Sequence, residues 1–494
     1  MRASGILMHL TSLPGPYGVG TMGKTAYSFI DFLEKSGQRY WQILPLTPTG
    51  YGDSPYQSCS AFAGNPYLID LDMLAREGLL EEKEIAERNW GDDPEKVDFG
   101  LLYENRLGLL RKAYGRYEDK DEAFTRFRAE NDWWLPQYAD FMALKDQTGG
   151  KPWYQWEDAI KYCYRENSGI AIHAPYEEIQ FYCFVQFLFA RQWDALREYA
   201  HSKGISIIGD VPIYVPYDSV EVWSDPWLFQ LDESLTPTAV AGCPPDYFNE
   251  NGQLWGNPLY RWDVHKNDGY RWWIRRLQAA ATRYDVVRID HFRAFAGYYA
   301  IPFGDETAKN GKWLPGPGMD FIRAVQENLP GLSMIAEDLG FLTEDVHALR
   351  DESGLPGMKV LEFAFDGSSD NAYLPYNHIK NSVCYTGTHD NMPIKQWLLE
   401  ENPDVTARAI AYMGDSQNPV WGMIRMALAS PADLTVVQLQ DYLELGGESR
   451  MNFPGTASGN WTWRARPEFL QDDALSERMK NLTRIYGRLG GEDL

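Results

Sequence analysis

The sequence lacks several features that would place it in other broad classes of protein. No stretch of about 18 or more apolar residues occurs in its 494 residues, so we expect no membrane-spanning helix. Lysine and arginine total 46 against 70 aspartates and glutamates, which gives a net charge of -24. A nucleic-acid partner usually requires a basic face, so this charge argues against phosphate-backbone binding. We therefore expect neither a membrane nor a nucleic acid among the partners.

Cysteine is also scarce, and its five copies show no paired spacing. They are Cys59, Cys163, Cys183, Cys243 and Cys384. An odd number without pairs fits a reducing cytoplasm better than a disulfide framework. The first residues, MRASGILMHLTSLPG, lack a sustained apolar region followed by a small-residue cleavage site. We expect a cytoplasmic protein in which these residues belong to the fold.

Aromatic residues and carboxylates are abundant instead, with 18 Trp and 30 Tyr among the aromatics. Flat aromatic faces with carboxylates between them suit sugar rings, whose C–H faces stack and whose hydroxyls donate hydrogen bonds. Composition alone leaves a second explanation open, because 44% hydrophobic residues can build a large core that simply uses aromatics.

Short apolar, β-rich segments recur along the chain, with helical patterns between most of them. The eight candidate strands are Ile6–Leu10, Tyr40–Leu46, Ile205–Val211, Val286–Ile289, Met334–Ala336, Val360–Phe363, Val383–Tyr385 and Met451–Phe453. This alternation predicts an α/β fold, a (β/α)8 TIM barrel. An open doubly wound sheet is the alternative. It favours a G-x-G-x-x-G turn after the first strand, and the glycines of LTSLPGPYGVG do not have that spacing.

Two intervals between predicted strands are too long for simple connections. Residues from about 75 to 175, between the second and third strands, show the patterns of extra helices, and a long helical pattern over Tyr176–Lys203 follows them. Residues from about 215 to 265, between the third and fourth, are rich in Pro, Gly, Asn and Trp, as in a structured loop layer. We therefore predict a single catalytic barrel over residues 1–494 that carries a helical insertion and an active-site loop insertion.

Carboxylates follow four of the predicted strands. They are Asp210, Asp290, Glu337 with Asp338, and Asp390, which His389 precedes. The carboxyl ends of barrel strands meet at one mouth, where four carboxylates repel one another unless chemistry or cations justify them. A metal is one explanation, but no compact D-x-D or H-x-H ligand set accompanies them, so we expect no metal. Glycoside chemistry is the other, because it needs one ionised and one protonated carboxyl group.

Arg288 stands two residues before Asp290 in VVRIDHFRAF, so both side chains should lie on one side of a strand. A guanidinium beside Asp290 is expected to lower the pKa of Asp290 and to keep it ionised, as a nucleophile requires. For these two residues alone, an ordinary ion pair explains the pattern equally well. The carboxylates at other strand ends favour the catalytic explanation.

VRIDHFR, IAEDLG and GTHDN resemble the three catalytic regions of the α-amylase clan. Four further stretches resemble the 4-α-glucanotransferase family, glycoside hydrolase family 77, whose members are also called amylomaltases or disproportionating enzymes. They are TPTGYGDSPYQSCSAFAGNPYLID, GDVPIYV, PPDYFNENGQLWGNPLYRW and FPGTASGNWTWR. The similarity runs from the first residues to about Arg466. It implies a retaining 4-α-glucanotransferase with α-1,4-glucan donor and acceptor sugars and without a cofactor.

The resemblance also assigns roles to the matching positions. It implies that Asp290 is the nucleophile, that Glu337 is the acid/base and that Asp390 binds and distorts the sugar. The substrate-binding positions that it implies are Tyr51, Asp210, Asp246, Gln253, Trp255, Arg288 and His389. Among these, Tyr51 would be a stacking platform, and Asp246, Gln253 and Trp255 lie in a loop that would close over the glucan. Packing within a turn or loop is the alternative for those four.

The carboxylates cannot distinguish transfer from hydrolysis, because both reactions use the same covalent intermediate. Loops that exclude water and subsites that bind an acceptor favour transfer. The preference for transfer therefore depends mainly on the resemblance. An α-1,4-glucan hydrolase remains the alternative within the same chemistry. A non-catalytic glucan-binding protein is a third possibility, although binding alone needs no nucleophile and acid/base. Chain-length preference and oligomeric state stay open.

Overall fold

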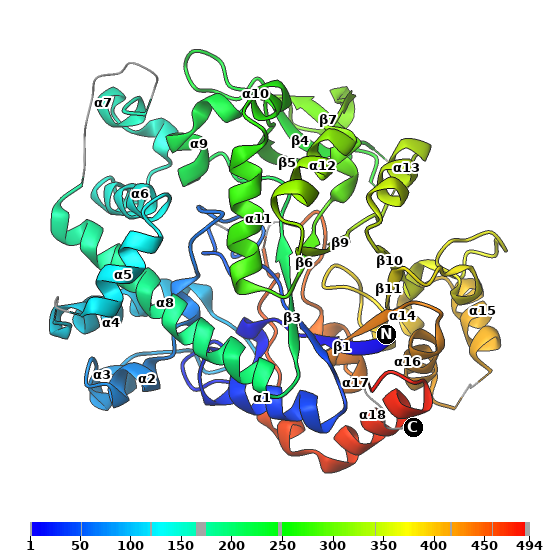
Figure 1. Ribbon diagram of the computed structural model, residues 1–494. Coiled ribbons are helices and arrows are strands. Elements are labelled where there is room, and N and C mark those ends of the chain that lie inside the picture. The colour runs from blue at the N-terminus through cyan, green and yellow to red at the C-terminus, as the bar shows by residue number, and fades with distance from the viewer. Residues whose placement is uncertain are drawn as a thin grey trace.

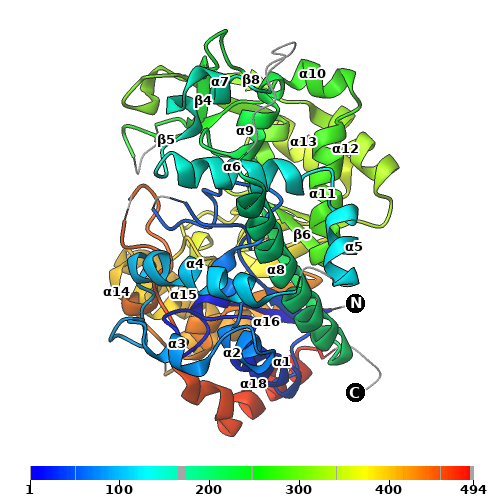
Figure 2. The same ribbon diagram turned by 90° about the vertical axis from the view of Figure 1, so that its left-hand side faces the viewer.

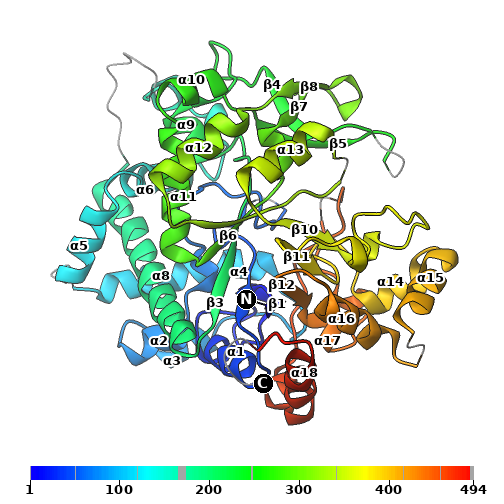
Figure 3. The same cartoon turned by 45° about the vertical axis from the view of Figure 1, so that its right-hand side comes forward.

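A computed structural model describes residues 2–50, 52–118, 121–164, 174–245, 249–340, 342–414, 417–456 and 458–489. Eight parallel strands close into a barrel in the order β1-β12-β11-β10-β9-β6-β3-β2 (Figure 1, Figure 3). They are β1 (Ala3–Leu7), β2 (Tyr40–Gln42), β3 (Ser206–Val211), β6 (Val286–Ile289), β9 (Ser333–Ala336), β10 (Gly357–Val360), β11 (Ser382–Tyr385) and β12 (Leu434–Gln438). The predicted TIM barrel is confirmed.

The barrel closes because each of these short strands pairs with a neighbouring strand on both sides. Gln438 at the end of β12 lies opposite Leu7 at the end of β1, which completes the ring. Gly209 precedes Asp210 in β3, and a Cβ at this position would clash with the ring of Tyr284. Glycine therefore lets that ring pack directly on the strand that carries Asp210.

Two of the predicted strands are misplaced. The eighth strand is LTVVQ, Leu434–Gln438, and Met451–Phe453 is irregular chain beyond it. The sixth strand is Gly357–Val360, and the predicted segment Val360–Phe363 turns into the short 3-10 helix η7, Leu361–Phe363. Pairing decides both cases, because an apolar run becomes a barrel strand only where neighbouring strands bond to it. Leu434 lies opposite Ala3 of β1, and Met358 lies opposite Val383 of β11.

Helices cover the outside of the barrel between successive strands. The main ones are α1 (Lys24–Lys35), α8 (Tyr176–Ser202), α11 (Arg271–Arg283), α12 (Gly318–Asn328), α13 (Glu344–Ser353), α14 (Ile394–Glu400), α15 (Pro403–Met413), α16 (Pro419–Ala429) and α18 (Asp473–Ile485). Trp273 of α11 is fully buried, as expected for a helix that packs on the barrel. Among the described residues, none of the helices has the length and apolar character that a membrane span requires.

Between β2 and β3 the chain forms a group of helices on one flank of the barrel (Figure 2). They are α2 (Leu71–Arg76), α3 (Glu82–Ala86), α4 (Phe99–Arg116), α5 (Glu122–Glu130), α6 (Leu135–Gln147) and α7 (Asp158–Lys161). Aromatic contacts join them to α8, as where the rings of Tyr117 and Phe184 lie 4.7 Å apart. The long helix α8 thus connects this layer to the barrel.

The interval between β3 and β6 is more regular than a loop layer. It contains α9 (Val220–Ser224), β4 (Ala239–Cys243), β5 (Gln253–Pro258) and α10 (Trp262–Asn267). Strands β4 and β5 join β7 (Gly297–Pro302) and β8 (Lys312–Pro315) in an antiparallel sheet of order β5-β4-β7-β8. We call it the insertion sheet. Half of it comes from the chain after β6, so its pairing cannot be read from residues 215–265 alone.

Candidate functional site

Asp290 and Glu337 extend the parallel pairing of β6 and β9 by one residue. Ile289 lies opposite Ala336, and these residues end their strands. The Asp290 N–H donates to the Val211 carbonyl at 3.1 Å, and the Glu337 N–H donates to the Ile289 carbonyl at 3.0 Å. Backbone hydrogen bonds to neighbouring strands therefore hold both carboxylates side by side at the carboxyl ends of adjacent strands.

Arg288 contacts two carboxylates at once. Its Nη1 donates to Asp210 Oδ2 at 2.5 Å and to Asp290 Oδ1 at 3.1 Å. Asp210 lies opposite Arg288 in the barrel and its side chain is fully buried, whereas the Asp290 side chain is 28% exposed. The expected contact between Arg288 and Asp290 is present, and Asp210 is a second and closer partner.

The pKa of Asp290 lies well above its ordinary value because burial disfavours its charge. Arg288 acts in the opposite direction, as predicted, but its effect is smaller than that of burial. The prediction that the pKa of Asp290 is low is therefore wrong. Burial also raises the pKa of Glu337. Two neighbouring carboxyl groups with raised pKa values can hold one proton between them. One group is then ionised, as a nucleophile requires, and the other is protonated, as an acid requires.

Glu337 accepts two backbone hydrogen bonds that fix its position. The His291 N–H donates to Oε2 at 2.6 Å, and the Leu339 N–H donates to Oε1 at 2.9 Å. His291 has φ 51°, a left-handed conformation that turns the chain directly after Asp290. The His291 ring packs edge-on against Trp255, with ring centres 4.8 Å apart. The turn after Asp290 thus positions Glu337 and contacts the insertion sheet.

Asp390 follows β11 and is held from two sides. Asn452 Nδ2 donates to Asp390 Oδ1 at 2.6 Å, and His389 Nε2 lies 3.4 Å from Asp390 Oδ2. Arg450 Nη2 donates to the Asp390 carbonyl at 3.1 Å. Burial lowers the pKa of His389, which keeps its ring neutral in ordinary buffers. Asp390 therefore presents its carboxylate from a fixed position beside a neutral imidazole.

Tyr56 connects the two sides of the mouth. Its ring stacks on His389 with centres 5.1 Å apart and an angle of 18° between the planes. Its O–H donates to Asp210 Oδ2 at 2.8 Å. Tyr51 was predicted from the same GYGDSPY stretch, whereas Tyr56 was missed. The signal for Tyr56 in the sequence was its place in that turn after the second strand.

Gln253 and Trp255 lie at the beginning of β5, where Trp255 Nε1 donates to Gln253 Oε1 at 3.0 Å. The contact between Trp255 and His291 brings this pair beside the turn that follows Asp290. Tyr51 and Asp246, two further predicted substrate-binding residues, lie outside the described residues.

Asp338 is a strand-end carboxylate that does not join the others. It accepts hydrogen bonds from Arg350 Nη1 at 2.8 Å and from the Met358 N–H at 2.7 Å. These bonds tie the end of β9 to α13 and β10, and its side chain is 1% exposed. Asp338 therefore belongs to the barrel wall.

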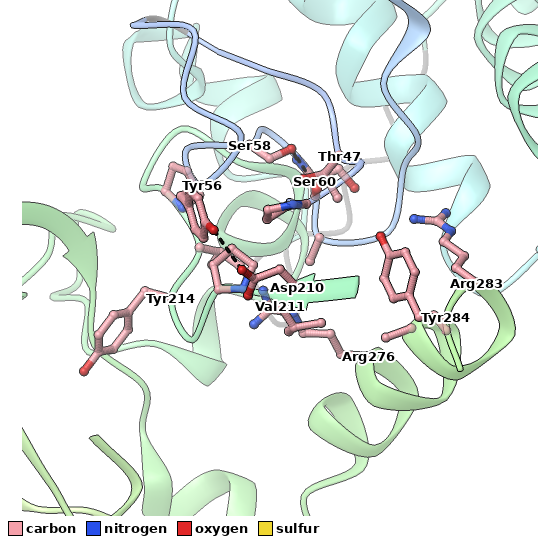
Figure 4. A pocket seen from close by; sticks show the side chains of 17 residues that line it. Thr47, Tyr56, Ser58, Ser60, Asp210, Val211, Tyr214, Arg276, Arg283 and Tyr284 are labelled. Carbon is pink, nitrogen blue, oxygen red and sulfur yellow. Dashed lines mark hydrogen bonds between the residues drawn. The ribbon is translucent and has the colours of Figure 1, made fainter. Parts of the chain in front are cut away.

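A cavity of about 40 Å³ lies behind Asp210, between the turn after β2, the end of β3 and α11. Figure 4 shows Tyr56 directed at Asp210 on one side of it, with Arg276 of α11 and Tyr284 on the other. This volume is far below the several hundred Å³ of typical ligand sites. The cavity lies against the back of Asp210 and is too small for a sugar.

Within the described ranges, no group of three or more His, Cys, Asp or Glu side chains is arranged to hold a metal ion. The mouth carboxylates are instead bonded to a guanidinium, an amide, a phenol and backbone N–H groups. The arrangement offers two carboxyl groups on adjacent strands, with a third across the mouth, for acid/base and nucleophilic work.

Comparison with known proteins places this geometry in a family. The family model described as 4-alpha-glucanotransferase matches residues 8–470. A 4-alpha-glucanotransferase of Clostridium butyricum is 45% identical over 488 residues, 97% of this chain and 100% of the relative. One of Thermus thermophilus is 48% identical over 482 residues, 94% of this chain and 95% of the relative.

Solved structures agree with these relatives. An amylomaltase from Streptococcus agalactiae in complex with acarbose has a TM-score of 0.94 and 42% identity, covering 99% of this chain and 100% of that one. An amylomaltase from Corynebacterium glutamicum has a TM-score of 0.80 at 19% identity, covering 98% of this chain and 75% of that one. The second structure shares the fold.

Proposed function

Because the chain belongs to the 4-alpha-glucanotransferase family, we propose that Asp290, Glu337 and Asp390 are the catalytic residues of its glucan transfer. The chain is an enzyme that transfers α-1,4-glucan segments. The observation that carries the residue assignment is the pair of carboxyl groups that end adjacent strands, with Arg288 Nη1 3.1 Å from Asp290.

In the first half of the reaction, the Asp290 carboxylate attacks the anomeric carbon of the donor sugar. The bond from that carbon to the glycosidic oxygen breaks, and Glu337 gives its proton to the departing oxygen. The products are a free glucan with a new 4-hydroxyl and a glycosyl ester on Asp290. Arg288 supports this step because its charge favours the ionised form of Asp290 and so opposes the rise of its pKa.

In the second half, the acceptor sugar presents its own 4-hydroxyl. Glu337, now ionised, takes the proton of that hydroxyl while its oxygen attacks the anomeric carbon. The ester bond to Asp290 breaks and its carboxylate is restored. Two displacements at one carbon retain its configuration.

We assign substrate binding to residues that surround this pair. Asp390 and His389 bind sugar hydroxyls from across the mouth, and Asp210 and Arg288 hold the sugar beside Asp290. Gln253 and Trp255 contribute from β5. For Tyr51 and Asp246 the support is the family resemblance. The relative solved with acarbose supports a saccharide ligand, with α-1,4-glucans as donor and acceptor.

The insertion sheet supports transfer over hydrolysis. Trp255 of β5 packs against His291, whose N–H bonds to Glu337. An aromatic side chain beside the turn that positions Glu337 excludes water from this side of the mouth, while an acceptor sugar brings binding energy of its own. We propose that residues 215–265 act as a cover for the mouth and residues 75–175 as a helical insertion. The free thiols of Cys59, Cys183 and Cys384 support a cytoplasmic location.

The experiment is incubation with maltotriose, followed by separation of the products. Transfer gives glucose together with a ladder of oligosaccharides longer than maltotriose, whereas hydrolysis gives only glucose and maltose. Asp290→Asn and Glu337→Gln should each lower turnover at least about 100-fold. Asp366→Asn, at an exposed carboxylate after β10, is the matched control and should keep parental turnover. Normal turnover in either site variant would overturn the assignment.

A further inference from the structure

A second and larger pocket lies away from the strand-end carboxylates, against the insertion sheet. Its volume is about 390 Å³, within the usual range of ligand sites. Its lining includes Gln230, Arg261, Trp262, Asp263 and Tyr298. They come from the chain before β4, the beginning of α10 and the beginning of β7. These elements lie together at the top of Figure 1, beyond β6.

Trp262 provides a rigid aromatic surface on one side of this pocket. Its ring centre lies 5.1 Å from that of Tyr260 and 6.0 Å from that of Phe295, and its ring stacks at 24° on the buried Trp273. Trp262 nevertheless remains partly exposed where it lines the pocket. A tryptophan fixed in this way offers an apolar surface for the C–H face of a sugar ring at little cost in side-chain entropy.

The polar side chains around Trp262 are planar groups suited to pairs of hydroxyls. Gln230 Nε2 donates to the Tyr260 carbonyl at 3.0 Å and to the Tyr298 hydroxyl at 3.2 Å, which fixes the amide. Because the Tyr298 oxygen accepts that bond, its O–H can donate to a ligand. Arg261 and Asp263 form an ion pair of 3.3 Å with 45% and 69% of their side chains exposed. A guanidinium and a carboxylate can each bond two neighbouring hydroxyls.

The charge of the pocket favours a neutral ligand. Arg261 and Asp263 cancel one another, and the described lining residues carry no excess of positive charge. The chain as a whole carries a net charge of -24, which disfavours anions. An aromatic surface, planar hydrogen-bonding groups and no net charge together match an uncharged polyhydroxylated ligand.

We propose that this pocket is a non-catalytic binding site for a segment of an α-1,4-glucan chain. The choice of an α-1,4-glucan as the sugar rests on the proposed function, whereas the pocket itself rests on its own geometry. A long glucan held there and in the mouth at once gains from the high effective concentration of its second part. Maltotriose is too short to gain in this way, so the pocket acts only on long substrates.

The kinetic test compares long and short substrates in the parent, two pocket variants and a control. The pocket variant is Arg261→Ala/Asp263→Ala, with Tyr298→Phe as a milder second variant. The matched control is Arg323→Ala/Glu352→Ala, which removes an exposed ion pair of 2.7 Å between α12 and α13. The KM for amylose should rise about three- to tenfold in the pocket variants and stay unchanged in the control. The KM for maltotriose should match the parent in all of them. An unchanged KM for amylose in both pocket variants overturns the proposal.

A binding experiment separates this proposal from the proposed function. Titration calorimetry of Asp290→Asn protein with maltoheptaose should reveal two classes of site, and addition of the pocket substitutions should leave one. A single class before those substitutions overturns the second site. Turnover of maltotriose by Asp290→Asn protein would overturn the catalytic assignment instead. The number of classes of binding site would still show whether the pocket binds a glucan.

Discussion

Arg288 is the cationic side chain that pairs with two carboxyl groups of the mouth. A single atom, Nη1, bonds to a fully buried carboxylate, that of Asp210, and to the proposed nucleophile Asp290. Removing one partner from such a cluster leaves the others buried with uncompensated charge. The ion pair is therefore structural and functional at once, because Arg288 pairs with the buried carboxylate of Asp210 and also favours the ionised form of Asp290.

Replacing Arg288 with lysine should change the pH dependence of the reaction. A lysine side chain ends one bond short of the Nη1 atom that contacts both carboxylates, so its lowering effect on the pKa of Asp290 is weaker. The pKa of Asp290 then rises, and the acidic limb of kcat/KM moves to higher pH because the nucleophile must be ionised. We expect kcat to fall at least about tenfold.

A pH profile of kcat/KM from maltotriose transfer measures this shift. Arg106→Lys is the control, because Arg106 of α4 is a buried arginine that bonds to the carbonyls of Tyr67 and Ile69. An acidic limb that stays in place in Arg288→Lys protein would contradict the account.

Tyr56→Phe removes one hydroxyl and keeps the ring that stacks on His389. The lost bond is the one to Asp210, so we expect kcat/KM to fall about tenfold, consistent with one bond to a charged group. Tyr385→Phe is the matched control for Tyr56→Phe, because it also removes one buried O–H, which donates to Gln42 Oε1 at 2.9 Å inside the barrel. It should lower the free energy of unfolding by about 1–2 kcal/mol and leave kcat/KM unchanged. Equal losses of activity in the two variants would contradict a specific role for Tyr56.

The hairpin of β4 and β5 brings Trp255 to the turn that follows Asp290. Gly242 of β4 makes this possible, because a Cβ there would overlap the Gln253 carbonyl oxygen and lie 2.5 Å from Ile301 Cδ1. The first of these atoms is backbone and cannot rotate away. A side chain at position 242 therefore pushes β4 away from the beginning of β5, which carries Gln253 and Trp255.

Gly242→Ala should lower transfer activity on maltotriose at least about tenfold, because the first residues of β5 must move. Loss of the contact between Trp255 and His291 should also change the tryptophan fluorescence. Gly108→Ala is the control: Gly108 lies within α4 with open space around its Cβ position, so alanine should stabilise the helix by about 1 kcal/mol. Full activity in Gly242→Ala protein would show that the position of β5 does not matter.

The elements that the sequence predicted correctly are those with a strong local pattern. Val286–Ile289 was predicted with the bounds of β6, and the predicted Met334–Ala336 lies within β9. A proposed catalytic carboxylate follows each of them, and α8 begins at Tyr176 as its periodicity indicates. LTVVQ was missed, although it is apolar and pairs with both β1 and β11, and Met451–Phe453 was predicted as the eighth strand in its place. That misplacement also hid Asn452, whose amide bonds to Asp390.

The remaining features depend on contacts between distant segments. Asp338 resembles its neighbour Glu337 in sequence, and the hydrogen bonds that it accepts from Arg350 and from the Met358 N–H place it in the barrel wall. Tyr56 gains its place from Asp210 and His389, which lie far along the chain. The insertion sheet needs β7 and β8 from beyond β6. No pattern within one segment carries such information.

Burial lowers the pKa of several histidines, which are therefore neutral in the folded protein. Burial lowers the pKa of His378 to about 4, from 6.5, and its Nε2 lies 2.8 Å from the Tyr373 carbonyl oxygen. The unfolded chain binds a proton more readily than the folded one between these two values. The contribution of His378 to stability is therefore complete above about pH 6.5 and is lost as the pH falls towards about 4.

His378→Gln should flatten the loss of stability in that window. The difference between the two pKa values corresponds to about 3 kcal/mol at full loss, and the variant lacks the group that titrates. Urea unfolding of parent and variant between pH 4 and pH 7 measures the slope. His347→Gln, at a partly exposed histidine of α13, should keep the parental slope. A slope in His378→Gln protein equal to that of the parent would contradict this assignment.

We propose that Asp290 forms the covalent bond to the sugar while Glu337 moves the proton. The most direct measurement uses Glu337→Gln protein with an α-glucosyl fluoride, whose leaving group needs no acid but whose intermediate needs a base for its breakdown. Peptide mass spectrometry should find one glucosyl residue on the peptide that contains Asp290, and none in Asp290→Asn/Glu337→Gln protein. A glucosyl residue on any other side chain, or fluoride release at the parental rate by Asp290→Asn protein, would contradict the account.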